Sequence, residues 1–310
     1  MRVESIRAIE ELALSDPQVV VVASDPGAGF MSELAAKHPE RLMLEGVCEQ
    51  ALVGTSAGLA SEGFYPFIIM LAVFGTRRCY EQLLLDFGLH RYSGCMVGVG
   101  TGFNYSVLGP THIAVDDLAL LTSVPGAAVM APSEPNEAVL LIRQARAFRG
   151  LSYLRLAAST ESLQDPRGDI NLGKGRVLGD AGPVLFISCG AATLVVEAAR
   201  AMLKEGGIQA GSLHIHTLKP LDTDLVRRSV KAARVVVCVE EHRKIGGLSS
   251  AVLHALTSGD SSLVPARFAS VGVDDGFPEG YGGYRDALER YGISAVSLAE
   301  KARTMLSSTA

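Results

Sequence analysis

The chain contains the run Val19-Val20-Val21-Val22 shortly after an amphipathic segment that extends from Val3 to Leu14. Apolar positions in the earlier segment recur with the period of a helix that buries one face. A run of β-branched residues without a polar position is typical of a strand covered on both faces, as in parallel sheets. Together the two segments predict the start of an α/β domain.

The alternation of strand and helix continues through the first half of the chain. We predict strands near Leu42 and at residues 67–71, 96–99, 128–130 and 153–156, and helices at residues 49–62, 76–87 and 135–148. This alternation favours a mostly parallel sheet with helices on its faces. We therefore expect residues 1–160 to form one α/β domain.

A second alternation follows a break in the pattern. From Ala157 to Gly182, Ser, Thr, Asp, Gly and Pro accumulate and apolar periodicity is weak, so we predict an interdomain linker at residues 161–182. Beyond it we predict strands at residues 184–188, 212–215, 235–239 and 266–271, and helices at residues 193–204, 222–232 and 248–256. Residues 183–310 are thus expected to form a second α/β domain with a mostly parallel sheet flanked by helices.

Composition argues against several classes of protein. The chain has 310 residues, of which 48% are hydrophobic and 20% charged, so it is expected to bury a large core. A net charge of −5 offers no basic surface for nucleic acid. No apolar run approaches the roughly 18 to 20 residues of a membrane span. The five cysteines never form a CxxC pair, which fits a reducing compartment, so we expect a cytoplasmic protein with no nucleic-acid or membrane partner.

No motif of a nucleotide-binding or hydrolase site stands in the structural context that its chemistry requires. Gly98 to Gly102 has close glycines after a predicted strand but completes neither a GxGxxG fingerprint nor a phosphate loop with its lysine. The spacing GxSxG occurs at Gly54-Thr55-Ser56-Ala57-Gly58, but inside the helix predicted at residues 49–62 and not at the strand-to-helix turn of a nucleophile elbow, which argues against a serine hydrolase.

Two residues remain as candidates for chemistry. Glu49 stands at the start of a predicted helix, where an acid is either an ordinary first-turn residue or a buried carboxylate that exchanges a proton with a ligand. His112 follows Gly109-Pro110 on a glycine-rich loop, where it is either structural or placed to move a proton at the ligand crevice of an α/β sheet.

The ordered motifs of the chain resemble the C-terminal half of a transketolase, and most of all the small subunit of a split, two-component transketolase. The resemblance covers almost the whole length and rests on several segments, namely Ala23-Ser24-Asp25, Gly46-Val47-Cys48-Glu49-Gln50, residues 53–66, residues 74–82, Gly109-Pro110-Thr111-His112, residues 218–222, Val239-Glu240-Glu241-His242 and Gly246-Gly247-Leu248.

The resemblance implies a thiamine-diphosphate-dependent enzyme that transfers a two-carbon ketol unit from a ketose to an aldehyde acceptor. The first domain would bind the aminopyrimidine ring of the cofactor, and the second would be the transketolase C-terminal domain. No GDG motif with its metal ligands is present, so we expect no metal site on this chain. A larger N-terminal subunit would bind the diphosphate and Mg²⁺ or Ca²⁺, in an α2β2 assembly in which this chain forms a homodimer.

The same resemblance assigns roles to residues of the cofactor site. Glu49 would be catalytic, through a hydrogen bond to the pyrimidine ring nitrogen. Phe74 would stack on the ring, Leu71 would form an apolar wall, and Asp25 would lie near the cofactor. His112 would be catalytic and bind donor hydroxyls.

Substrate residues include two departures from the family. Arg155 matches an arginine that binds substrate phosphate, although an ion pair is the alternative. Leu108 stands where transketolases place an aspartate for the acceptor hydroxyl, and Gly102 falls near a second, phosphate-binding histidine. We therefore expect a less polar acceptor pocket, for an unphosphorylated aldehyde or a carrier-bound acyl group.

Two alternatives to this function stay open. The β subunit of a 2-oxo acid dehydrogenase shares the domain order and the glutamate, although Gly109-Pro110-Thr111-His112 favours a transketolase. A non-catalytic interaction subunit that keeps the fold is the other.

Overall fold

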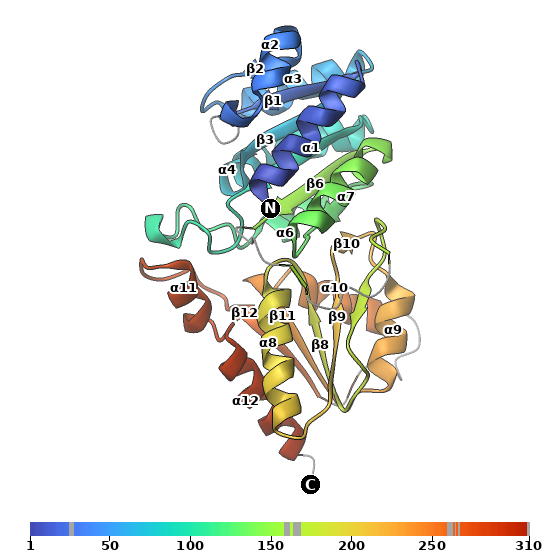
Figure 1. The fold of residues 1–310 in the computed structure, drawn as a ribbon, viewed down its shortest axis with the longest axis vertical. Coiled ribbons are helices and arrows are strands. Elements are labelled where there is room, and N and C mark those ends of the chain that lie inside the picture. The colour runs from blue at the N-terminus through green and yellow to red at the C-terminus, as the bar shows by residue number, and fades with distance from the viewer. Residues whose placement is uncertain are drawn as a thin grey trace.

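The computed structural model of the chain shows two α/β domains, each a sheet between layers of helices (Figure 1). It describes residues 1–24, 28–157, 162–163, 169–258, 263, 265 and 267–308. Among the described residues, eight of the ten strand pairings are parallel. The two antiparallel pairings join β10 (Thr217–Lys219) to β5 (Ala128–Met130) and β7 (Arg176–Leu178) to β9 (Ala210–His214). The predicted fold class is therefore confirmed.

The first sheet has the strand order β10-β5-β6-β4-β3-β1-β2. Its strands are β1 (Val19–Ala23), β2 (Leu42–Leu44), β3 (Tyr65–Leu71), β4 (Gly94–Val99), β5 (Ala128–Met130), β6 (Leu151–Leu156) and β10 (Thr217–Lys219). None of the four valines of β1 is more than 2% exposed. Helices on both faces bury this strand completely, which is why its sequence lacks polar positions.

Helices cover both faces of the first sheet. One face packs against α1 (Arg2–Ser15) and α7 (Pro135–Ala147), which lie side by side in Figure 1. The other packs against α3 (Glu49–Ser61), α4 (Ala72–Arg78) and α6 (Asp117–Ser123). Three short segments complete the domain: α2 (Ser32–Lys37), α5 (Tyr80–Gln82) and a π-helical turn at Leu83–Leu89.

The start of α4 differs from the prediction. We expected a helix from residue 76, whereas α4 begins at Ala72, directly after β3. Because Ala72, Val73 and Phe74 continue the apolar run of the strand, the sequence pattern does not mark where the strand ends. The earlier start places Phe74 on the helix.

The second sheet has the strand order β12-β11-β8-β9-β7. Its strands are β7 (Arg176–Leu178), β8 (Val184–Ser188), β9 (Ala210–His214), β11 (Val235–Arg243) and β12 (Phe268–Val273). Helices α8 (Ala192–Glu205) and α12 (Ala295–Ser307) cover one face, and α9 (Thr223–Lys231) and α10 (Leu248–Thr257) cover the other. Helix α11 (Tyr284–Arg290) lies beside the loop before His112 (Figure 1).

Strand β7 lies inside the range 161–182, which we expected to be a linker. It pairs with β9 in antiparallel register, with Val177 opposite Leu213, so this part of the range belongs to the second sheet. Three residues are too few to show a strand period, and the surrounding Gly and Asp residues obscured them.

Strand β10 crosses from the second domain to the first. It pairs with β5 at the edge of the first sheet, and the Lys219 ammonium donates to the carbonyls of Thr122 (2.8 Å) and Val124 (2.6 Å). The amide of Ala131 also donates to the carbonyl of His216 (2.8 Å). The two domains therefore share the first sheet, and one hydrophobic core cluster contains buried residues of both domains. Within the described ranges, no helix is both long enough and apolar enough to cross a membrane.

Candidate active site

A buried carboxylate lies at the carboxyl edge of the first sheet. Glu49 is the first residue of α3, follows the N-cap residue Cys48, and is only 3% exposed. The amino end of a helix favours a negative charge. Of the described residues, only Arg78 forms a hydrogen bond with the Glu49 side chain, through Nη1 to Oε2 at 2.6 Å. Oε1 thus has no partner in the described part of the chain.

Arg78 also contacts an aromatic ring. Its guanidinium carbon lies 5.1 Å from the ring centroid of Phe74, one helical turn earlier on α4. A planar cation over an aromatic face is a favourable cation–π arrangement. The Arg78 side chain is 47% exposed, whereas its partner Glu49 is buried.

His112 also contacts the Phe74 ring. The two ring centroids are 5.2 Å apart and the rings are nearly perpendicular, at 78°. Nδ1 of His112 is 2.9 Å from the Thr111 hydroxyl. Four residues, Glu49, Phe74, Arg78 and His112, therefore form one chain of contacts, which we call the Glu49 cluster.

Two other expected cofactor residues fall next to this cluster in sequence. Leu71 is the N-cap residue of α4 and is half-buried, one turn before Phe74. Asp25 lies outside the described residues. The structure thus brings together Glu49, Phe74 and His112 from three separate segments.

A side chain at Gly102 would collide with Glu241 of the second domain. Its φ of +58° is in the left-handed region, and a Cβ there would lie 2.4 Å from Oε2 of Glu241 in the second domain. Tyr284 donates a hydrogen bond of 2.6 Å to the other Glu241 oxygen, and burial raises the pKa of this carboxyl. A carboxyl group therefore occupies the space where a histidine at position 102 would extend.

The loop around Leu108 contacts the second domain through its neighbours Ser106 and Gly109. Leu108 ends a short 3-10 turn (Ser106–Leu108) and is 51% exposed. The Ser106 hydroxyl donates to the carbonyl of Gly282 (2.9 Å), and a Cβ on Gly109 would lie 2.5 Å from the Tyr281 ring. Leu108 thus presents an apolar side chain on the loop that leads to His112.

Arg155, the residue expected to bind substrate phosphate, is buried and ion-paired in this structure. This residue is 2% exposed, and its Nε donates to Asp117 at 2.8 Å. Nη2 donates to the carbonyls of Ala114 (3.2 Å) and Glu241 (2.8 Å). Burial, the largest single influence, lowers the pKa of the guanidinium, but the Asp117 carboxylate, together with Tyr153 and Glu241, raises it overall. In this structure Arg155 therefore forms a buried ion pair and joins the two domains.

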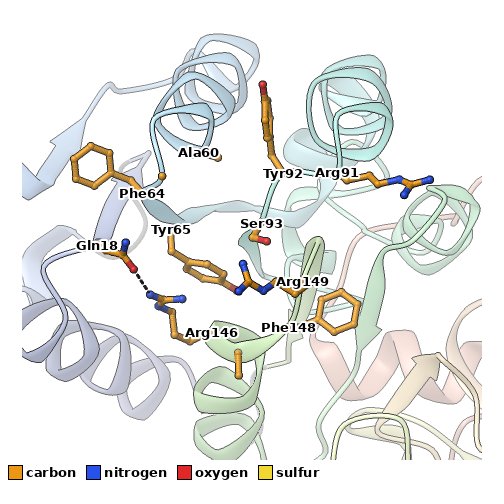
Figure 2. A pocket seen from close by; sticks show the side chains of 12 residues that line it. Gln18, Ala60, Phe64, Tyr65, Arg91, Tyr92, Ser93, Arg146, Phe148 and Arg149 are labelled. Carbon is orange, nitrogen blue, oxygen red and sulfur yellow. Dashed lines mark hydrogen bonds between the residues drawn. The ribbon is translucent and has the colours of Figure 1, made fainter.

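A polar cavity of about 550 Å³ lies at the opposite edge of the first sheet (Figure 2). None of the predicted site residues lines it. Helices α3 and α7 end there, and Arg146 of α7 donates to Asp16 (2.9 Å) and Gln18 (3.1 Å) while lying over the Tyr65 ring. An arginine in the last turn of a helix offsets the partial negative charge of that end. These contacts give the cavity a structural explanation that is separate from the Glu49 cluster.

Comparison with known proteins places the chain in a family. The family description "Transketolase, pyrimidine binding domain" matches residues 1–160, and "Transketolase, C-terminal domain" matches residues 173–297. The chain therefore belongs to the transketolase family and contains these two domains.

Individual relatives are separate subunits of similar length. The chain is 30% identical to one of the subunits of the apulose-4-phosphate transketolase of Phocaeicola vulgatus, over 86% of this chain and 84% of that one. It is 31% identical to a 6-deoxy-6-sulfo-D-fructose transketolase subunit of Clostridium sp. strain MSTE9, over 94% and 90%. A solved structure, described as a split gene transketolase in an inactive beta4 tetramer, superimposes with a TM-score of 0.88, 30% identity, and coverage of 99% and 98%. The resemblance to the small subunit of a split transketolase is confirmed.

Two residues of the site, Arg78 and Glu241, were not predicted individually from the sequence. The signal for Arg78 was present, because residues four apart on a helix lie on the same face and Phe74 precedes it by four. Glu241 gave no such signal, since its contact with Gly102 spans the two domains.

Proposed function

We propose that this chain is the pyrimidine-binding subunit of a two-component, thiamine-diphosphate-dependent transketolase. The reaction would transfer a two-carbon ketol unit from a ketose to an acceptor. The observation that carries this proposal is the buried Glu49 carboxylate beside Phe74 and His112 at the carboxyl edge of the sheet. When bound, thiamine diphosphate supplies the carbon nucleophile that ketol transfer requires.

The residues of the Glu49 cluster fit the aminopyrimidine half of that cofactor. Oε1 of Glu49 has no partner among the described residues, so one carboxylate oxygen of this buried residue is free for a ring N–H. The Phe74 ring offers a flat apolar face for an aromatic ligand. Leu71 adds an apolar side chain one turn away. Hydrogen bonding, stacking and apolar contact are therefore all available from adjacent elements.

Each residue then has a defined task. Glu49 holds a proton at the ring nitrogen of the pyrimidine, and its burial keeps water from competing for that hydrogen bond. Phe74 fixes the ring plane. His112, at the edge of Phe74, hydrogen-bonds the hydroxyls of the donor sugar and moves a proton there. Asp25 is assigned to the cofactor site by resemblance alone.

A partner subunit completes the site in this proposal. The chain matches only the pyrimidine-binding and C-terminal domains, and no group of three or more His, Cys, Asp or Glu in its described part could hold a metal ion. The larger subunit would hold the diphosphate and its Mg²⁺ or Ca²⁺. The similar split-gene protein is described as inactive in its beta4 form, which supports an α2β2 enzyme built on contacts between copies of this chain.

The acceptor side is proposed to bind no phosphate through this chain. Arg155 is occupied by Asp117, Gly102 has no side chain, and the Glu241 carboxyl fills the adjacent space. Leu108 adds apolar surface. These features support an unphosphorylated aldehyde or a carrier-bound acyl acceptor.

The test is the variant Glu49→Gln, assayed with the candidate large subunit for ketol transfer and for thiamine-diphosphate binding by calorimetry. We expect loss of transfer, because an amide does not hold the proton as a carboxyl group does. Glu45→Gln, an exposed acid four residues earlier, is the matched control and should keep full activity. Transfer by Glu49→Gln at the wild-type rate would contradict the mechanism. Turnover of a 2-oxo acid in place of a ketose would favour the dehydrogenase alternative, and a complex without turnover would favour an interaction subunit.

A further inference from the structure

Arg78 makes two contacts that together match those expected of the cofactor ring. Its Nη1 donates to Glu49 at 2.6 Å, and its guanidinium carbon lies 5.1 Å from the Phe74 ring centroid. Glu49 and Phe74 are the two residues that the proposed function assigns to the pyrimidine. One side chain of the chain therefore engages both groups at once.

The chemistry of Arg78 explains how it can do so. A guanidinium is planar, carries a positive charge, donates N–H groups in its own plane and stacks on aromatic faces. A protonated aminopyrimidine is also a planar cation with N–H donors in its plane. A carboxylate and an aromatic ring arranged for one of these groups therefore also suit the other.

The exposure of the two partners differs. Arg78 is the last residue of α4, and its side chain is 47% exposed. Glu49 is 3% exposed in the first turn of α3. The guanidinium can turn outward to solvent, whereas the carboxylate is fixed by its surroundings.

We propose that Arg78 is a placeholder that occupies the pyrimidine site of the cofactor-free chain and moves outward when the ring binds. This inference rests on the proposed function. The Arg78–Glu49 pair stabilises the empty site, because it spares a buried carboxylate from standing alone. The cofactor must then break this pair before it can bind. Removing Arg78 raises the free energy of the empty site and leaves the occupied site unaffected.

The neighbouring residue Arg77 provides a matched control. Its Nε donates to Asp116 at 2.8 Å and its Nη2 to the carbonyl of Ile113 at 3.0 Å. Arg77 has the same charge and lies on the same short helix, but no described hydrogen bond joins it to Glu49.

The first experiment measures thiamine-diphosphate binding by calorimetry, with Mg²⁺, in the complex with the large subunit. We expect Arg78→Ala to tighten binding by about tenfold, because one charge-assisted hydrogen bond no longer has to be broken. The affinity of Arg78→Lys for thiamine diphosphate should lie between those of the wild type and Arg78→Ala, because the lysine ammonium pairs with Glu49 but cannot stack on Phe74 as a planar group. Arg77→Ala should leave the dissociation constant unchanged.

A second experiment does not depend on the partner subunit. The probe is the fragment 4-amino-5-aminomethyl-2-methylpyrimidine, whose binding to the free chain is followed by ligand-observed NMR. Arg78→Ala should bind this fragment more tightly than the wild type and Arg77→Ala.

The outcomes separate the two proposals. A wild-type complex that fails to bind thiamine diphosphate would overturn the proposed function. A wild-type complex that binds it, with Arg78→Ala binding equally well or more weakly, would overturn the placeholder alone. Weaker binding would show that Arg78 supports Phe74 from the face opposite the ring. The fragment experiment tests the role of Arg78 whether or not the complex binds thiamine diphosphate.

Discussion

Asp117 and Arg155 form an ion pair of 2.8 Å in which neither side chain is more than 2% exposed. Asp117 begins α6 and Arg155 lies on β6, and the Tyr153 hydroxyl donates to the same carboxylate oxygen at 2.7 Å. Since Arg155 also donates to the carbonyl of Glu241, the pair ties the second domain to the first.

Replacement of Asp117 should therefore be costly. We expect Asp117→Ala to lower the free energy of unfolding by about 3–5 kcal/mol, because it leaves a buried guanidinium without its counter-charge. Chemical denaturation of the free chain measures this. The control is Asp116→Ala, which breaks a partly exposed pair with Arg77 and should cost less than about 1 kcal/mol. Equal losses for the two variants would contradict the role given to Arg155.

Gly102 should tolerate substitution less well than another glycine with a similar backbone. Both Gly102 (φ +58°) and Gly46 (φ +65°) are left-handed, but a Cβ on Gly46 meets nothing within 4 Å. Gly46→Ala should cost about 1 kcal/mol of stability from backbone strain alone. Gly102→Ala adds the contact with Glu241, so its melting temperature should be clearly lower. Similar melting temperatures would show that Glu241 moves away without cost.

Stability should fall in mild acid because of His216. Burial, the largest influence, lowers the pKa of this histidine to about 4, whereas in the unfolded chain its pKa is about 6.5. Between these values the unfolded state binds a proton that the folded state does not, so the free energy of unfolding decreases as the pH falls. We expect a loss of about 2 kcal/mol between pH 7 and pH 5 from this residue.

Denaturation at several pH values measures that loss. His216→Asn should show a flatter dependence over the same range, whereas His90→Gln, at an exposed position, should keep the wild-type slope. A wild-type slope in His216→Asn would assign the acid sensitivity to other groups.

A thiol reagent should modify only the cysteine that lies next to Glu49 in the sequence. Cys48, next to Glu49, is exposed, whereas the other four cysteines are buried. Burial, and secondly the Glu49 carboxylate, raise the pKa of Cys79 to about 12, so its thiol stays protonated. Iodoacetamide should therefore label one residue of the native free chain, and Cys48→Ser should abolish that labelling. Mass spectrometry of the native and the unfolded chain distinguishes this from general reactivity.

Much of the fold could be predicted because it depends on local patterns. The apolar run at Val19–Val22, the strand at residues 128–130 and the strand at residues 184–188 all fall where the structure has β1, β5 and β8. Strands buried on both faces produce uninterrupted apolar runs, which stand out from their surroundings. Strands β7 and β10 are three residues each and depend on partners distant in sequence, so no local pattern marks them.

The candidate site was predictable only in part for the same reason. The positions of Glu49 and His112 next to turns indicated chemistry, and the structure links them through Arg78 and Phe74. The burial of Arg155 could not be foreseen, since it follows from Asp117 and from a carbonyl of the other domain. Arg78 and Glu49 lie on different helices and are 29 positions apart in the sequence, so no local pattern marks their pairing.

The path of β10 has a consequence for how this protein can be divided. Its pairing with β5 caps the edge of the first sheet with residues that belong to the second domain. A fragment made of the first domain alone would expose the backbone amides and carbonyls of β5, and an open strand edge recruits other chains into aggregates. Engineered fusions and truncations of this protein should therefore keep both domains in one polypeptide.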